Sequence, residues 1–306
     1  MKKVLITGGS GFIGRHCLPA LVASGYEVHA VSLIPEDPLP QIHWHVVDLL
    51  NPGEVNDIVS SVKPTHLLHL SWYMVVGKYW TSLENVRWVQ ASLELLRVFA
   101  ANGGKRVVMA GTCAEYDWNY ELCSEQTTPL VPSTLYGACK HALQIMVDAF
   151  CRQTGLSYAW GRIFFLYGPH EHPDRLVSSV IRALLQGEPA RCSHGNQLRD
   201  FLHVEDVAHA FVALLDSNIE GAVNIGQGTP AAIREIVETI GEQLGAKHLI
   251  QLGALPSPPN EPPVLIADTR RLKSIGWQAK YDLKTGLEHT IAWWKNNLLT
   301  AKRPQQ

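Results

Sequence analysis

The fold of this chain is decided near its start by Thr7-Gly8-Gly9-Ser10-Gly11-Phe12-Ile13-Gly14, which lies between the strand-like run Lys3–Thr7 and a helical pattern. Gly8 suits a tight turn, Gly11 lets the backbone approach a pyrophosphate, and Gly14 permits close packing of the helix. Free N–H groups at the start of that helix attract phosphates. The unit predicts a dinucleotide site, and the alternative is a glycine-rich turn that binds nothing.

Short strand-like runs alternate with helical patterns through the N-terminal half. The expected strands after the first are Glu27–Ser32, His43–Asp48, His66–Leu70 and Arg106–Ala110, followed by a long helix from Tyr136 to Gln153 and a buried strand at Leu156–Phe164. Alternation of this kind predicts an α/β fold of Rossmann type, a doubly wound parallel sheet that binds its ligand at the carboxyl ends of the strands.

The chain is expected to divide into two parts. Residues 1–165 form the dinucleotide-binding Rossmann domain, and residues 166–306 form mainly a smaller C-terminal α/β lobe that binds the substrate. Within the second part, the chain is expected to return to the Rossmann sheet around residues 200–225. The proline-rich stretch Pro256–Pro263 predicts a stiff surface loop, and Leu283–Asn297 predicts a closing helix.

Composition excludes several classes of protein. With 46% hydrophobic and 18% charged residues the 306-residue chain is globular, and its formal net charge of -2 gives no reason to expect nucleic acid or an anionic membrane as partner. The six cysteines show neither a CxxC pair nor zinc spacing, which indicates a reducing cytoplasm and no metal site. No apolar run reaches about 18 residues and no signal-peptide pattern is present, so we expect a protein that is neither membrane-spanning nor exported.

The identity of the dinucleotide depends on the end of the second strand. An acidic residue there would bind the ribose 2′-hydroxyl of NAD, but the position is Ser32. Because serine does not repel a 2′-phosphate, NADP is permitted and slightly favoured over NAD, although no arginine follows to bind that phosphate. Asp48 is expected either at the adenine edge or as a turn cap. The other expected cofactor-binding residues are Phe12, Ile13, Leu49 and Leu70.

Tyr136 and Lys140 form the candidate proton-transfer pair. They stand four residues apart, which places both on one face of a helix. A nearby ammonium stabilises the phenolate, and this would make Tyr136 an acid or base that works near neutral pH. The YxxxK spacing alone is common by chance. Thr112 strengthens it, because this residue lies just past the apolar strand Arg106–Ala110 and would project a hydroxyl over the nicotinamide pocket.

These motifs resemble those of the extended short-chain dehydrogenases, a family that includes the nucleotide-sugar epimerases, dehydratases and 4-ketoreductases. The resemblance runs in order through TGGSGFIG, Thr112, Tyr136–Lys140, Arg162–Pro169, Arg199–Asp206 and Ile275–Trp277. It implies that Tyr136 is the catalytic acid/base, that Lys140 binds the nicotinamide ribose, and that Thr112 hydrogen-bonds the sugar oxygen at the reacting carbon. It also implies that Arg199 binds the diphosphate of a nucleotide-sugar substrate and that the chain forms a homodimer through long helices.

Departures from the family pattern limit the reaction. The dehydratases carry an acidic pair directly after the strand-end threonine, where this chain has Cys113 and Ala114, so 4,6-dehydration has no evident acid or base. Phe165 replaces an asparagine that holds the substrate phosphates in many relatives, and the run Asn260–Pro263 replaces a usual arginine. We therefore expect diphosphate contacts that differ from those of the relatives.

Two further features are candidates for the sugar pocket. The aromatic residues around Tyr73 either stack on a hexose or pack in the core. His170 resembles in position an acid/base histidine of the combined epimerase-reductases, and the alternative is a surface histidine. Trp88 stands where relatives often place asparagine, with Asn85 one turn earlier.

Three functional hypotheses follow from the sequence. The first is a reductase, in which NAD(P)H delivers hydride to C4 of a nucleotide-linked 4-keto-6-deoxyhexose while Tyr136 donates a proton. The second is a 4-epimerase that retains NAD⁺ and returns hydride to the other face of the sugar. Ser32 places the reductase first, because it permits a released NADPH. The third, a non-catalytic dinucleotide-binding protein, is disfavoured because Thr112, Tyr136 and Lys140 are all present.

Overall fold

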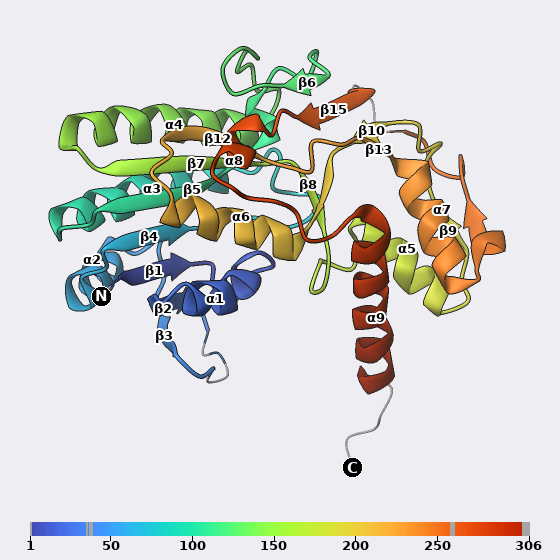
Figure 1. Cartoon of the computed structure of the whole chain (residues 1–306), viewed down its shortest axis with the longest axis horizontal. Helices are drawn as coiled ribbons and strands as arrows, with labels where there is room; N and C mark the ends of the chain where they lie inside the picture. Colours follow the sequence, from blue (N-terminus) through green and yellow to red (C-terminus); the bar gives the residue numbers. More distant parts are fainter. Residues whose placement is uncertain (1, 35, 37–38, 258–260, 302–306) are drawn as a thin grey trace.

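A seven-stranded parallel sheet forms the core of the larger of two lobes (Figure 1). The computed structural model describes residues 2–34, 36, 39–257 and 261–301, so residues 258–260 of the proline-rich stretch and the last five residues lie outside the described part. In sheet order the strands are β12 (Gly221–Ile225), β7 (Ser157–Ile163), β5 (Arg106–Thr112), β4 (His66–His69), β1 (Lys3–Thr7), β2 (Glu27–Ser32) and β3 (Ile42–Val46). The predicted Rossmann-type fold is confirmed.

Helices cover both faces of this sheet. On one face α1 (Gly14–Ala23) packs against α6 (Val204–Asp216), and on the other face lie α2 (Pro52–Val62), α3 (Glu84–Ala101) and α4 (Leu135–Thr154) (Figure 1). Alternate residues of the strands enter the two cores: Val4 and Ile6 face α1 and α6, whereas Leu5 faces α2. Because both faces are buried at the centre of the sheet, β1 and β5 are almost continuously apolar there, whereas β3 at the edge alternates apolar and polar residues and is partly exposed.

Local signals set the ends of the helices that matter most for the site. The Thr134 side chain accepts a hydrogen bond from the Gly137 N–H at 3.1 Å and so caps α4 directly before Tyr136. Asn51 caps α2 in the same way, with Oδ1 accepting from the Gly53 N–H. The third strand ends at Val46, two residues earlier than predicted, because Asp48 turns the chain toward α2.

The smaller lobe packs three helices around its own apolar core. These are α5 (Leu176–Leu185), α7 (Ile233–Leu244) and α9 (Leu283–Ala301), beside the short strands β9 (Ala190–Arg191) and β14 (Ile250–Gln251). Two more groups of strands join the lobes: β8 (Phe165–Tyr167) with β11 (Phe201–His203), and the four-stranded order β13 (Ala231–Ala232), β10 (Leu198–Arg199), β15 (Val264–Ala267) and β6 (Leu122–Cys123). Short α8 (Arg270–Ser274) packs beside β12.

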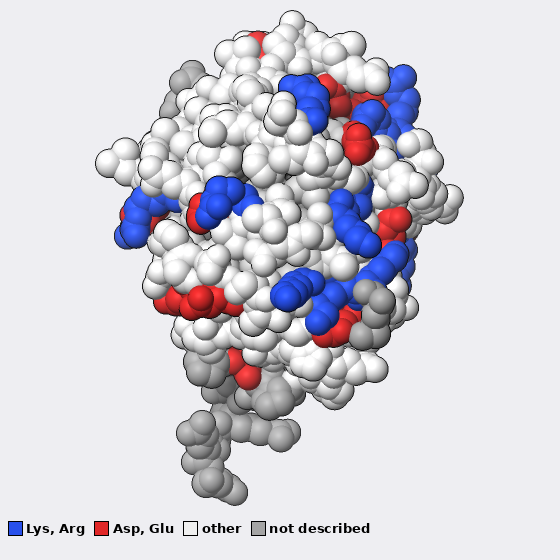
Figure 2. Space-filling model, turned by 90° about the vertical axis from the view of Figure 1, so that its left-hand side faces the viewer, with Lys and Arg blue, Asp and Glu red and all other residues white. Residues whose placement is uncertain are grey.

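The surface carries mixed charge. On the face that Figure 2 shows, acidic and basic side chains are interspersed and neither sign forms a continuous field. Within the described residues, none of the helices has the length and apolar character that a bilayer crossing requires. All six cysteines are free and buried, and the cytoplasmic location expected from them stays a prediction.

Candidate active site

The phosphate loop after β1 takes the conformation that its glycines permit. Gly8 has a φ of 71°, and the Gly11 N–H donates to the Gly8 carbonyl at 3.0 Å to close the turn. A Cβ at Gly14 would overlap that same carbonyl oxygen, so only glycine fits where the helix meets the loop. The loop also lies against the chain after β4, because the Gly8 Cβ position is within 3.2 Å of Leu70 and Ser71 backbone atoms.

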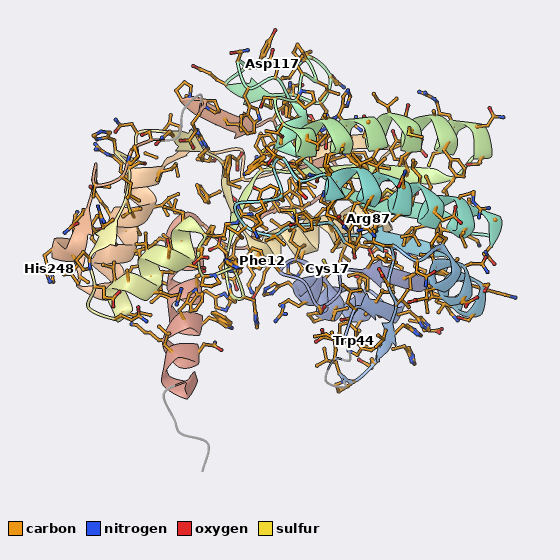
Figure 3. All side chains as sticks on the ribbon, turned by 180° about the vertical axis from the view of Figure 1, so that it is seen from behind. Phe12, Cys17, Trp44, Arg87, Asp117 and His248 are labelled. Carbon is orange, nitrogen blue, oxygen red and sulfur yellow. The ribbon has the colours of Figure 1, made fainter. Side chains whose placement is uncertain are left out.

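The start of α1 presents donors that the protein itself does not use. In the described chain, the backbone N–H groups of Phe12, Ile13 and Gly14 donate to no other protein group. Figure 3 places Phe12, two residues before α1, near the junction of the two lobes. Unpaired N–H groups at a helix N-terminus, in a loop that tolerates no side chain at Gly14, fit the pyrophosphate of a dinucleotide.

A carboxylate that the sequence analysis missed lies at the end of β2. The Ser32 hydroxyl donates to Oε1 of Glu36 at 3.1 Å, and the Ser10 hydroxyl of the phosphate loop is 3.4 Å from the Ser32 hydroxyl. Glu36 therefore stands where the ribose of the adenosine is expected, and its charge would repel a 2′-phosphate. In the sequence, Glu36 could have been noticed as the first acidic residue after the strand, four residues beyond Ser32.

The remaining cofactor candidates take different places. Asp48 is exposed and its Oδ1 accepts the Leu50 N–H at 2.9 Å, which is the turn-cap alternative; a contact with adenine stays a prediction. Leu49 is buried in the core between the sheet and α2. Leu70 donates its N–H to the Thr7 carbonyl at 3.2 Å, directly beside the phosphate loop.

Thr112, Tyr136 and Lys140 come together at the carboxyl end of β5, all at least nine-tenths buried. Thr112 ends the strand, and its hydroxyl accepts the Ala114 N–H at 3.2 Å. Tyr136 lies in the first turn of α4, where the Thr112 side chain hydrogen-bonds its phenol. One turn later, the Lys140 ammonium donates to the Ala110 carbonyl at 2.9 Å and lies 3.7 Å from the centre of the Trp72 ring.

Burial is the main influence on the pKa values of Tyr136 and Lys140. It raises the pKa of Tyr136, and the hydrogen bond with Thr112 opposes this rise. Burial also lowers the pKa of Lys140 to about 7, with only a partial opposing effect from Glu115. The lowering of the Tyr136 pKa that was expected from Lys140 is therefore smaller than the rise that burial causes. A desolvated lysine carries much less charge at neutral pH. Burial alone therefore favours the neutral phenol, and Tyr136 can accept a proton only where a nearby positive charge stabilises its phenolate.

A buried ion pair that the sequence analysis missed holds the end of β5. Glu115 is fully buried: its Oε1 accepts the Thr112 N–H at 2.8 Å and the Trp160 indole N–H at 2.9 Å, and its Oε2 accepts the Arg162 Nε–H at 2.7 Å. Arg162 in turn donates to the Tyr116 hydroxyl at 3.0 Å. The carboxylate of Glu115 is thus committed to the core beneath Thr112. In the sequence, the charged Arg162 within the predicted buried strand could have indicated a buried acidic partner.

Aromatic rings enclose the phenol of Tyr136. Tyr79, Trp80 and Trp72 lie with ring centres 5.1, 5.7 and 6.5 Å from that of Tyr136. Tyr73 packs in the same cluster. Asn85 holds this segment in place, because it accepts the Trp72 indole N–H at 2.8 Å and donates to the carbonyls of Tyr79 and Ser82. Its side chain is therefore committed to the aromatic segment.

The smaller lobe adds a cation that the sequence analysis missed. Arg175, the residue before α5, is half-buried with its guanidinium carbon 5.4 Å from the centre of the Tyr79 ring. No carboxylate of the described residues forms an ion pair with it. Through Tyr79 this cation stands next to the aromatic wall around Tyr136. Its contact was not predictable, since 96 residues separate the two partners.

Arg199, the expected diphosphate ligand, is already paired. It is almost fully buried, with Nη2 3.0 Å from Oε1 of Glu261 and its guanidinium carbon 5.5 Å from the centre of the Phe165 ring. Glu261 belongs to the run that replaces an arginine, and Phe165 replaces an asparagine. The two residues that depart from the family pattern, Glu261 and Phe165, therefore both contact Arg199. An anion bound at Arg199 must compete with Glu261.

His170 contacts α1 and α9 rather than the group around Tyr136. Its Nδ1 is 2.7 Å from Nη1 of Arg15, and its ring centre is 4.6 Å from that of Trp293. Burial, with the nearby charge of Arg15, lowers its pKa to about 4. The side chain is exposed and neutral near pH 7, which matches the surface-histidine alternative, and a role in substrate binding stays a prediction.

Known proteins resemble this chain along nearly its whole length. A family model described as the NAD dependent epimerase/dehydratase family matches residues 4–226. A UDP-glucuronic acid decarboxylase 1 from Danio rerio is 28% identical over 97% of this chain and 73% of its own length. A putative UDP-glucose 4-epimerase from Methanocaldococcus jannaschii is 27% identical over 96% of this chain and 99% of its own length. MoeE5, solved in complex with UDP-glucose and NAD, is 31% identical in sequence to this chain. The two structures align with a TM-score of 0.84 over 97% of this chain and 99% of MoeE5.

Proposed function

The chain belongs to the NAD dependent epimerase/dehydratase family, and from that premise we propose that it is an NAD-dependent 4-epimerase of a nucleotide-linked hexose. The observation that carries the proposal is the buried set of Thr112, Tyr136 and Lys140 at the carboxyl end of β5, beside a phosphate loop with unpaired N–H groups. Relatives whose names state UDP-glucose 4-epimerase activity support the reaction type.

Glu36 supports NAD over NADP as the cofactor. Ser32 was the reason to prefer NADP and a released cofactor, but its hydroxyl is engaged by the carboxylate of Glu36. A negative charge at the ribose favours NAD, which has a free 2′-hydroxyl to donate, over NADP. With NAD favoured, the sequence argument for a reductase over an epimerase loses its basis. When bound, NAD supplies the acceptor and donor of hydride at C4.

The side chains of this protein supply the proton transfers. Tyr136 removes the proton of the C4 hydroxyl as the carbon is oxidised and returns it when the carbon is reduced. Thr112 hydrogen-bonds the same oxygen and so fixes its distance from the phenol. Lys140, when protonated, favours the phenolate form of Tyr136. The aromatic wall of Tyr79, Trp80 and Trp72 keeps water away from these groups.

A second candidate is the reductase of a 4-keto-6-deoxyhexose. The observation that favours it is the same aromatic wall, because a C6 methyl group packs on Tyr79 and Trp80 without needing the hydrogen bonds of a hydroxymethyl group. Both candidates use Thr112, Tyr136 and Lys140 in the same roles, so the fate of the reduced cofactor separates them.

One assay distinguishes the two candidates. Purified protein is incubated with NAD⁺ and UDP- and dTDP-linked hexoses, and separately with NADH or NADPH and nucleotide-linked 4-keto-6-deoxyhexoses, with NMR of the sugar and cofactor absorbance followed together. Inversion at C4 without net cofactor change supports the epimerase, and stoichiometric oxidation of reduced cofactor supports the reductase. Tyr136→Phe should lower either turnover by about 10²-fold or more while cofactor affinity is largely retained. No reaction on either panel would contradict the proposal.

We also propose a homodimer that pairs α3 and α4 with their copies. These helices are neighbours and expose the apolar side chains Val86, Ile145 and Met146. Exposed apolar groups on adjacent long helices suit a helical interface. A molar mass by light scattering of twice the 33.9 kDa of the chain is the expected result.

A further inference from the structure

Four polar side chains share one face of the sheet at its outer edge, away from the groups described above. Glu27 and His29 alternate on β2, so they point to the same side, and His43 and His45 do the same on β3. His29 and His43 are direct neighbours in the register of these two strands. The edge of the sheet therefore presents a carboxylate and three imidazoles side by side.

Three of these side chains bring their ligand atoms close together. One carboxylate oxygen of Glu27 and one ring nitrogen each of His29 and His43 all lie within 4.8 Å of one another. The shortest of these separations joins His29 Nε2 and Glu27 Oε1 at 2.9 Å. The rings of His29 and His43 stack with centres 4.8 Å apart. Because His43 is exposed, its ring can turn toward a shared ion without disturbing the core.

His45 occupies the position of a residue that orients a metal ligand. Its Nε2 is 2.9 Å from Nδ1 of His29. In this structure His29 Nε2 donates its proton to Oε1 of Glu27. Binding an ion would require the other tautomer, in which His29 Nδ1 donates to His45 Nε2 and leaves the lone pair of His29 Nε2 free on the side where Glu27 and His43 lie. Metal-binding histidines almost always have their second nitrogen fixed by a hydrogen bond of this kind.

We propose that Glu27, His29 and His43 form a zinc site, with His45 orienting His29 and water completing the coordination. Two imidazoles and one carboxylate with an open fourth position are a ligand set that Zn²⁺ accepts. The cysteine spacing that indicated no metal site does not bear on this cluster, since it contains no cysteine.

Lys3 is the feature that opposes metal binding. Its Nζ is 3.0 Å from Oε1 of Glu27, the oxygen that His29 also approaches. A divalent ion must displace this ammonium, which is partly exposed and can move to water. The net affinity therefore depends on competition between two cations for one carboxylate, and removing the charge of Lys3 should tighten metal binding.

The site would be structural. The ion would join β2 to the edge strand β3, which pairs with the sheet on one side only. The cofactor candidates Ser32 and Glu36 lie at the opposite, carboxyl end of β2. Zinc should therefore raise the thermal midpoint of unfolding and leave turnover unchanged, which keeps this inference separate from the proposed reaction.

The test uses full-length protein without a histidine tag, treated with chelator and then titrated with ZnCl₂ by calorimetry. One Zn²⁺ per chain is expected, with affinity lower by about tenfold or more in His43→Gln and in His29→Gln, and about tenfold lower in His45→Gln. Lys3→Gln should bind more tightly. His248→Gln, which alters an exposed histidine in the other lobe (Figure 3), should bind as the unaltered protein does.

Three results would overturn the zinc site. One is the absence of stoichiometric binding at micromolar zinc in a protein that is folded by circular dichroism. Another is binding of equal strength in His43→Gln, which is the informative variant even if His29→Gln misfolds, because His43 is exposed and its loss leaves no buried gap. A zinc-dependent rise of the thermal midpoint that persists in His43→Gln would lead to the same conclusion.

Discussion

The ammonium of Lys140 lies 3.7 Å from the centre of the Trp72 ring, although 68 residues separate the two side chains. The Ala110 carbonyl at 2.9 Å and the negative charge of Glu115 also offset the burial of this ammonium. A cation over the face of an indole is stabilised by up to about 2 kcal/mol when both groups are desolvated. Trp72 therefore acts as a positioning residue, which holds Lys140 and supports its protonated form.

Trp72→Leu should shift the pH profile of activity. Loss of the ring lowers the pKa of Lys140 further below its present value of about 7, and about 1.4 kcal/mol corresponds to one pH unit. The alkaline limb of turnover, measured at saturating cofactor, should therefore move about one unit toward acid. Trp72→Phe should show a smaller shift. Trp88→Phe, whose ring packs on Trp72, serves as the matched control, and an identical alkaline limb in all variants would refute the role of Trp72.

The pKa of Lys140 also predicts how stability depends on pH. Its native value of about 7 lies below the ordinary value of 10.5, so between these values the unfolded state binds a proton that the native state has released. Stability therefore rises with pH across this window, by up to about 1.4 kcal/mol per pH unit from this one group.

Lys140→Met should remove that contribution. Urea unfolding between pH 7 and about 9.5, below the ionisation of ordinary tyrosines, should show a flatter dependence on pH than the unaltered protein. Lys284→Met, which alters an exposed lysine, should leave the slope as it is. Parallel slopes for the unaltered protein and Lys140→Met would show that Lys140 is charged in the native state throughout.

Those parts of the site that depend on local geometry were predictable from the sequence. Gly8, Gly11 and Gly14 serve one turn, and Tyr136 and Lys140 share one face of one helix, so spacing alone brought each set together. Their order along the chain also predicted the Rossmann-type sheet and the family. The roles assigned to single residues stay predictions until they are tested with substrate.

Contacts between distant segments were not predictable. Glu115 meets Arg162 across 47 residues, and Arg175 meets Tyr79 across 96. Neither pair follows a helical or strand period, because each is set by how β5, β7 and the smaller lobe pack together. Glu36 was missed for another reason: the sequence after Ser32 shows no helical or strand period that would aim its carboxylate at Ser32.

Glu36→Gln should change the preference between dinucleotides. Removing the carboxylate beside Ser32 abolishes its repulsion of a 2′-phosphate, so the affinity ratio of NADP⁺ to NAD⁺ should rise by about tenfold, equivalent to about 1.4 kcal/mol. Quenching of tryptophan fluorescence gives both dissociation constants. Glu188→Gln in the other lobe is the control. A ratio that stays within twofold would place Glu36 outside the ribose site and reopen the choice of NADP.

The Glu115–Arg162 pair should hold the end of β5 through charge complementarity in the core. Both side chains are essentially inaccessible to water, and their 2.7 Å contact is their main electrostatic compensation. Either Glu115→Leu or Arg162→Leu leaves an unpaired buried charge and should cost about 3 to 5 kcal/mol of unfolding free energy. The double variant leaves neither charge, so it should lose much less than the sum of the two single variants. Urea unfolding of all four proteins measures this coupling. Additive losses would mean that the two side chains stabilise the core independently, and that Thr112 is held by the shape of its surroundings rather than by this ion pair.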